Sequence, residues 1–129
     1  FNDMAKLKQL NDISHPLVKK NIIELINEHN SKNTKLFVIE AAILIEAGYK
    51  DICDEIWYIW VAVEERIRRL MESRAYTREK CLSIINNQKT DDFYKVYANC
   101  TIDNSKSFEH TSNQLKHLLN NLYYDDIIN

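Results

Sequence analysis

The middle of the sequence carries the densest set of residues suited to binding phosphate. Five arginines fall within thirteen residues there: Arg66, Arg68, Arg69, Arg74 and Arg78. A planar guanidinium group can donate to two phosphate oxygens at once, which suits a site that holds phosphoryl groups. Four glutamates are interleaved with the arginines: Glu64, Glu65, Glu72 and Glu79. Helical spacing would turn these side chains to different faces, so the segment also fits a solvated surface of weak ion pairs.

Carboxylate and amide side chains stand at the expected carboxyl ends of two strands. Glu46 follows the apolar run at 36–45, and Asp103 and Asn104 close the short stretch at 99–104. In open parallel sheets, ligands bind beyond the carboxyl ends of the strands. A carboxylate there can hold a hydroxyl group or position a phosphate acceptor, whereas Asp and Asn are also ordinary turn residues. Position alone leaves both interpretations open.

His15 is a further candidate because Pro16 follows it and Lys19 and Lys20 lie one turn later. Proline suits the first turn of a helix, so the sequence predicts a helix start here. The free amides and the dipole of a helix start favour an anion. A histidine that only caps its own helix is the alternative.

The elements that must position these residues alternate between strand and helix. Three apolar runs predict buried parallel strands: "LFVIEAAILI" at 36–45, "EIWYIWVAV" at 55–63 and "NCTIDN" at 99–104. Helical periodicity predicts about six helices, with one near residues 4–10, one from Pro16 to His29, and one starting near Ser107. The sequence therefore predicts an α/β fold with a largely parallel sheet, and we expect residues 1–129 to form a single unit.

Composition excludes several classes of function. A net charge of −2 gives no basic field for a general nucleic-acid binder. The longest stretch without charged or strongly polar side chains, residues 56–63, is too short to span a membrane. No secretory leader opens the sequence and the three cysteines show no CxxC spacing, so we expect a cytoplasmic protein without a metal site. Gly48 is the only glycine, which excludes a glycine-rich phosphate loop within these residues.

Four stretches, taken in order, resemble the dephospho-CoA kinase family. They are "FNDMAKLKQLNDISHPLV", "VIEAAILIEAGY", "RIRRLMESRAYTREKCLSIINNQ" and "ANCTIDNSKSFEHTSNQLKHLL". The resemblance implies the carboxyl-terminal portion of a P-loop kinase-like fold. It also implies an activity, the transfer of the γ-phosphate of ATP to the ribose 3′-hydroxyl of dephospho-CoA in the last step of coenzyme A synthesis. ATP and Mg²⁺ would then serve the complete enzyme, with neither bound tightly by these residues.

The resemblance also implies roles for particular residues. Arg69 and Arg74 would lie in a lid near the ATP phosphates, Gln88 would support the lid hinge, Asp103 and Asn104 would lie in the adenine loop, and His15, Leu44 and Glu46 would lie on the dephospho-CoA side. The implied regions are an acceptor-side helical part at 1–34, core strands at 35–63, lid helices at 64–97, and the last strand and helix at 98–129.

Three substitutions depart from the family pattern. Ala75 stands where a glycine is common, Ala62 where a proline is frequent, and Asn99 where an aspartate is usual. The first would stiffen the lid.

The largest departure is the absence of the phosphate loop and of the acidic catalytic base from these 129 residues. We therefore expect the isolated chain to be inactive, and its fold to be incomplete without the P-loop strand. Unpaired strand edges would then require either an amino-terminal half or self-association. The alternative function is a non-catalytic module, derived from the kinase fold, that binds CoA, nucleotides or another protein.

Overall fold

The computed structural model describes residues 4–128. The chain divides into two compact units, Phe1–Asp54 and Glu55–Asn129. The single unit expected from the sequence stays a prediction. Among the described residues, no helix is long and apolar enough to cross a membrane.

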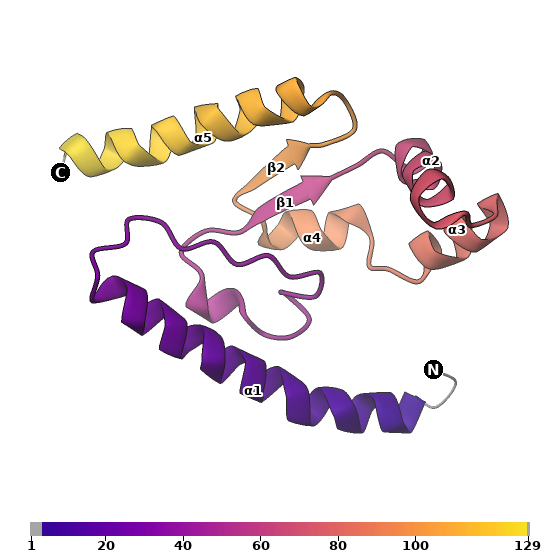
Figure 1. Cartoon of the computed structure of the whole chain (residues 1–129), viewed down its shortest axis with the longest axis horizontal. Coiled ribbons are helices and arrows are strands. Elements are labelled where there is room, and N and C mark those ends of the chain that lie inside the picture. Colours follow the sequence, from indigo (N-terminus) through magenta and orange to yellow (C-terminus); the bar gives the residue numbers. More distant parts are fainter. Residues whose placement is uncertain (1–3, 129) are drawn as a thin grey trace. The chain divides into compact units, whose positions relative to one another are not determined.

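The described part of the first unit, residues 4–54, contains one long helix, α1 (Met4–Asn30; Figure 1), and a short 3₁₀ helix, η1 (Lys50–Ile52). The prediction of two helices with a break before Pro16 is wrong, because Pro16 lies inside α1. Proline removes one backbone hydrogen bond, the one to the carbonyl of Asp12. Asp12, Ile13 and Leu17 are exposed, so water can reach the freed carbonyl and the helix continues.

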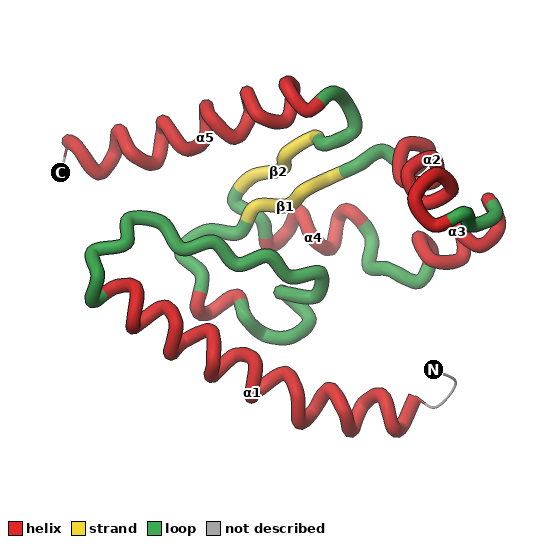
Figure 2. Tube along the Cα trace, in the orientation of Figure 1, coloured by secondary structure: helices red, strands yellow, loops and turns green. Residues whose placement is uncertain are grey.

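The predicted strand at 36–45 is also wrong. Residues 36–41 have no regular secondary structure and residues 42–48 form turns, as the loops in Figure 2 show. A strand needs a hydrogen-bonded neighbour, and the sheet of the described chain has two strands that pair with each other. Leu36, Phe37 and Val38 are correspondingly exposed rather than buried.

The turns end at a buried tyrosine that joins them to α1. Gly48 has a φ of +72°, which glycine adopts at little cost, so the expectation that it turns the chain is confirmed. Tyr49 is only 4% exposed and its hydroxyl donates to the carbonyl of His15 at 3.1 Å. Lys19 Nζ donates to the carbonyl of Gly48 at 2.7 Å and to Asp51 at 2.5 Å, which holds the pKa of the Asp51 carboxyl below its usual range.

The second unit is built on two parallel strands, β1 (Trp57–Trp60) and β2 (Cys100–Asp103). Both strands lie within predicted runs, so the parallel α/β prediction is confirmed for this pair. Ladder pairing runs from Trp57 with Cys100 to Trp60 with Asp103. The part of this unit that the structure describes also contains four helices: α2 (Val63–Arg74), α3 (Arg78–Asn86), α4 (Asp91–Tyr97) and α5 (Phe108–Ile128).

Packing within this unit follows the apolar positions of its elements. α4 packs against β1, α5 against β2, and α2 against α3. Ile67, Cys81 and Ile102 are at most 2% exposed and form the small core. Thr77 and Thr90 start α3 and α4, because each hydroxyl accepts a hydrogen bond at 3.3 Å from the backbone N–H three residues later.

Ala75 ends α2 in a left-handed conformation, with φ of 51° and ψ of 33°. This backbone geometry favours glycine because a Cβ atom meets the following carbonyl oxygen. The resemblance described from the sequence implies a glycine at this position, and the left-handed backbone gives a physical reason for that preference.

We therefore expect Ala75→Gly to raise the free energy of unfolding by about 0.5 to 1 kcal/mol, as the relief of strain outweighs the added entropy of the unfolded chain. Chemical denaturation measures this change. The matched control is Ala98→Gly, because Ala98 ends α4 with a φ of −85° and has no left-handed strain for glycine to relieve. Equal shifts in both variants would contradict the assignment of strain to position 75.

Candidate functional site

The carboxyl ends of β1 and β2 lie side by side because Trp60 and Asp103 are paired in the ladder. The chain continues from each strand into a loop, and two hydrogen bonds of 2.8 Å join the loop after β2 to the end of β1 and to the residues that follow β1. Asn104 N–H donates to the carbonyl of Trp60, and Ala62 N–H donates to the hydroxyl of Ser105. This end of the sheet is where open α/β folds bind ligands.

The loop after β2, residues 103–107, is held in one conformation by its own side chains. The Asp103 carboxylate accepts a hydrogen bond of 2.8 Å from Ser105 N–H. Ser105 holds the pKa of the Asp103 carboxyl below its usual range, and the nearby charges of Lys106 and His110 act in the same direction. His110 Nε2 lies 3.9 Å from the carboxylate. Asp103 is therefore a fixed, ionised group at neutral pH.

Arg69 connects α2 to this loop. Its Nη2 donates to the carbonyl of Asn104 at 2.8 Å, and its Nε donates to Glu65 at 2.8 Å. Nη1 has no hydrogen-bond partner among the described residues, so one edge of the guanidinium group remains available. The structure thus brings together Arg69, Asp103 and Asn104, three of the residues selected from the sequence.

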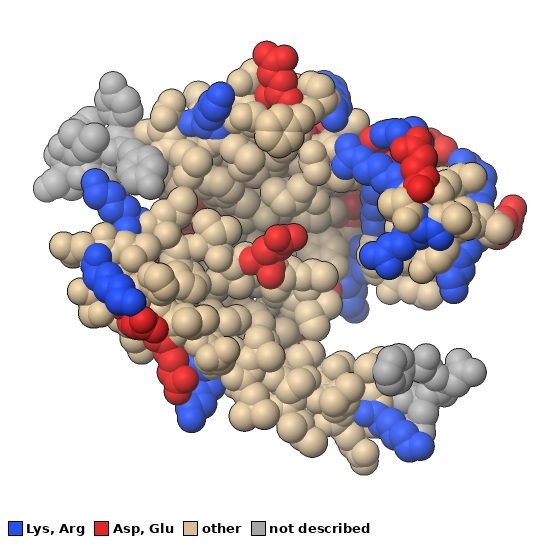
Figure 3. Space-filling model, in the orientation of Figure 1, with Lys and Arg blue, Asp and Glu red and all other residues tan. Residues whose placement is uncertain are grey.

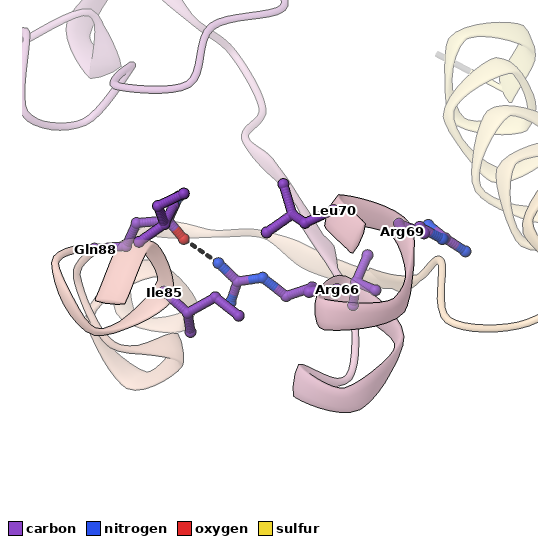
Figure 4. A pocket seen from close by; sticks show the side chains of 7 residues that line it. Arg66, Arg69, Leu70, Ile85 and Gln88 are labelled. Carbon is purple, nitrogen blue, oxygen red and sulfur yellow. Dashed lines mark hydrogen bonds between the residues drawn. The ribbon is translucent and has the colours of Figure 1, made fainter. Parts of the chain in front are cut away.

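A hollow of about 250 Å³ lies beside Arg69, between α2 and α3. Its lining is shown in Figure 4: Val61, Arg66, Arg69, Leu70, Ile84, Ile85 and Gln88. Arg66 points toward Gln88 and donates to its side-chain oxygen, whereas Arg69 points the other way. Gln88 therefore joins the end of α3 to α2, but through Arg66 rather than through an arginine selected from the sequence.

The other arginines divide into paired and unpaired groups. Arg68 bonds both Glu65 and Glu72, and Arg78 forms a two-fold contact with Glu64. These pairs confirm the solvated-surface interpretation for Arg68 and Arg78, and Figure 3 shows basic and acidic side chains mixed over α2 and α3. Arg68, followed by Arg69, lowers the pKa of Glu65 to about 2.

Arg74 differs from these arginines. It is the last residue of α2, is exposed, and has no hydrogen bond or ion pair among the described residues. A charged guanidinium at the end of a helix, next to the strained turn at Ala75, is free to meet an anionic ligand.

The residues expected on the acceptor side lie in the first unit, in positions that differ from the predictions. His15 is in the interior of α1, so the argument from a helix start is wrong for it. Leu44 and Glu46 lie in the turns at 42–48, not at a strand end, and Glu46 is exposed. Leu44 and His15 nevertheless share a partner: the Leu44 carbonyl accepts from Tyr49 N–H at 3.0 Å, and the His15 carbonyl accepts from the Tyr49 hydroxyl.

One polar cluster was missed by the sequence analysis. Asp91, in the first turn of α4, accepts hydrogen bonds from the Tyr58 hydroxyl at 2.9 Å and from the Trp60 indole at 2.6 Å. Burial, with the Asp91 carboxylate adding to it, raises the pKa of Tyr58 to about 12. Tyr58 and Trp60 are two positions apart in a strand, so their side chains lie on the same face. This spacing is the feature of the sequence that indicates a shared partner for the two donors.

Comparison with known proteins gives consistent matches. A family model described as dephospho-CoA kinase matches residues 1–110. The dephospho-CoA kinase of Dehalococcoides mccartyi is 36% identical over 109 residues, which cover 84% of this chain and 55% of that protein. The dephospho-CoA kinase of Carboxydothermus hydrogenoformans is 34% identical over 126 residues, which cover 98% of this chain and 61% of that protein.

A solved structure is similar as well. The crystal structure of TT1252 from Thermus thermophilus matches with a TM-score of 0.71 and 25% identity, over 95% of this chain and 62% of that chain. The chain thus spans between about half and two thirds of the length of these proteins.

Proposed function

Because the chain belongs to the dephospho-CoA kinase family, we propose that its parent protein transfers the γ-phosphate of ATP to the ribose 3′-hydroxyl of dephospho-CoA. These residues would supply the lid, the adenine loop and part of the acceptor side. A single observation carries this assignment of roles: Arg69 of α2 bonds the carbonyl of Asn104 at the carboxyl end of β2. That contact unites the lid and the loop in one potential nucleotide site.

In this proposal, the charge and hydrogen-bonding groups of each residue decide which part of the substrates it contacts. Arg69 offers the free edge of its guanidinium group, and Arg74 its whole group, to the phosphates of ATP, where developing negative charge is stabilised. Asp103 and Asn104 contact the adenine. His15, Leu44 and Glu46 serve the dephospho-CoA side from the first unit.

The cradling of the β- and γ-phosphates falls outside these residues in this proposal. They contain a single glycine, so they offer no run of exposed backbone amides for that purpose. The acidic base that activates the ribose hydroxyl is likewise assigned to other residues of the parent protein.

Mg²⁺ accompanies ATP in phosphoryl transfer and takes oxygen ligands from carboxylates and phosphates. Among residues 4–128, no three His, Cys, Asp or Glu side chains gather as a possible metal site. The roles proposed for the described residues are limited to arginine, amide, carboxylate and backbone contacts.

Arg74→Ala tests the lid assignment. We expect the KM of the parent protein for ATP to rise about tenfold, because one charge-assisted contact to phosphate is lost. Arg78→Ala is the matched control, since Arg78 is already held by Glu64 and is expected to leave the KM unchanged. If both variants behaved alike, Arg74 would have no role in binding ATP.

A further inference from the structure

Gln114 on α5 makes an unusual pair of contacts with the backbone at the end of β2. Its Oε1 accepts from Asp103 N–H at 3.0 Å, and its Nε2 donates to the carbonyl of Asp103 at 2.9 Å. The side-chain amide thus satisfies the donor and the acceptor of one residue, as a neighbouring strand would.

The two contacts act on the edge of β2 that faces away from β1. On the other side of the loop, Asn104 N–H is bound to Trp60 and the Asn104 carbonyl to Arg69. A second side chain of α5, the Thr111 hydroxyl, donates to Asn104 Oδ1 at 3.0 Å. The loop is therefore fixed from three elements, β1, α2 and α5.

This arrangement leaves few polar groups of the loop free. The Asn104 side-chain NH₂ has no partner among the described residues, and Asp103 Oδ2 has only His110 at 3.9 Å. These two groups are a donor and an acceptor on adjacent residues, which suits recognition of a heterocyclic base with complementary edge groups. Their spacing depends on the backbone of Asp103, and Gln114 holds that backbone.

We infer that Gln114 is a positioning residue for nucleotide binding, which fixes Asp103 and Asn104 in the geometry that binds the base of ATP. The inference rests on the proposed function. Loss of both contacts allows the end of β2 to move, so ATP binds more weakly while dephospho-CoA binding is unaffected.

The test compares Gln114→Met with wild type, because methionine keeps the length of the side chain and removes both hydrogen-bonding groups. We expect the Kd for ATP, measured by calorimetry on the natural protein, to rise about tenfold. The Kd for dephospho-CoA should stay the same, which a general loss of folding would not allow. Asn113→Met is the matched control, since Asn113 is the exposed neighbour on the same helix.

Hydrogen exchange and a second variant test whether Gln114 holds the backbone of Asp103. Hydrogen exchange at the Asp103 amide should be faster in Gln114→Met and unchanged in Asn113→Met. Gln114→Glu keeps the acceptor but places a carboxylate oxygen against the Asp103 carbonyl, so it should weaken ATP binding at least as much as Gln114→Met, and it replaces Gln114→Met if that variant does not fold.

The measurements distinguish a failure of the inference on Gln114 from a failure of the proposed kinase function. An unchanged Kd for ATP in Gln114→Met and Gln114→Glu would overturn the inference, as would equal weakening of ATP and dephospho-CoA binding. A wild-type protein that binds neither substrate would overturn the inference together with the proposed function. A wild-type protein that binds ATP but does not phosphorylate dephospho-CoA would contradict the proposed function alone.

Discussion

Arg69→Ala is expected to lower kcat/KM for dephospho-CoA phosphorylation by at least about 100-fold, the loss typical of removing one group that stabilises transition-state charge. Arg69 combines two duties that alanine cannot perform. It holds the Asn104 carbonyl and offers a free guanidinium edge beside the proposed phosphates. Steady-state kinetics on the natural protein, with ATP and dephospho-CoA varied separately, measures the effect.

Two variants separate this role from a general effect of charge. Arg69→Lys keeps the charge but cannot bind Glu65 and Asn104 in the same geometry, so it should recover only a small part of the activity. Arg68→Ala removes the neighbouring arginine, whose contacts are the exposed pairs with Glu65 and Glu72. A loss in Arg68→Ala as large as that in Arg69→Ala would show that the site depends on net charge and not on this contact.

Asp91→Ala is expected to lower the free energy of unfolding by about 2 to 4 kcal/mol, because it leaves two half-buried donors without their charged acceptor. Those donors are the Tyr58 hydroxyl and the Trp60 indole on β1. The same change should return the pKa of Tyr58 part of the way from about 12 toward its usual value, since the negative charge beside it is lost. Denaturation and ultraviolet titration of tyrosine measure the two effects.

Asp92 provides a closely matched control for this prediction. It is the next residue in the same first turn of α4, so it interacts with the helix dipole in a similar way, but it is exposed. Asp92→Ala should therefore change the free energy of unfolding by less than about 0.5 kcal/mol. If Asp91→Ala were equally mild, its contacts with Tyr58 and Trp60 would not stabilise the unit.

The sequence pattern predicted the second unit better than the first. The runs at β1 and β2 are rich in aromatic and β-branched residues, and the two strands pair with each other. The run at 36–45 is equally apolar, but a strand also needs a partner, and a pattern of residue types does not say whether one is present. The prediction of a helix start at Pro16 failed because proline is compatible both with a helix start and with an exposed helix interior.

The candidate site was predictable to the extent that it depends on residue type. Arg69, Asp103 and Asn104 were selected from charge, strand ends and the family resemblance, and the structure brings them together. Gln114 and Asp91 were not selected, because their importance lies in contacts across 11 and 31 to 33 positions of sequence. A glutamine in an amphipathic helix and an aspartate after a threonine cap are ordinary at the level of sequence.

The most direct test of the central claim is incubation of the natural protein with ATP, Mg²⁺ and dephospho-CoA, with the product identified by mass and by nuclear magnetic resonance. We expect a product heavier by one phosphate at the ribose 3′-hydroxyl, together with an equal amount of ADP. Release of ADP without a phosphorylated CoA product, or phosphate at another position, would contradict the proposed function.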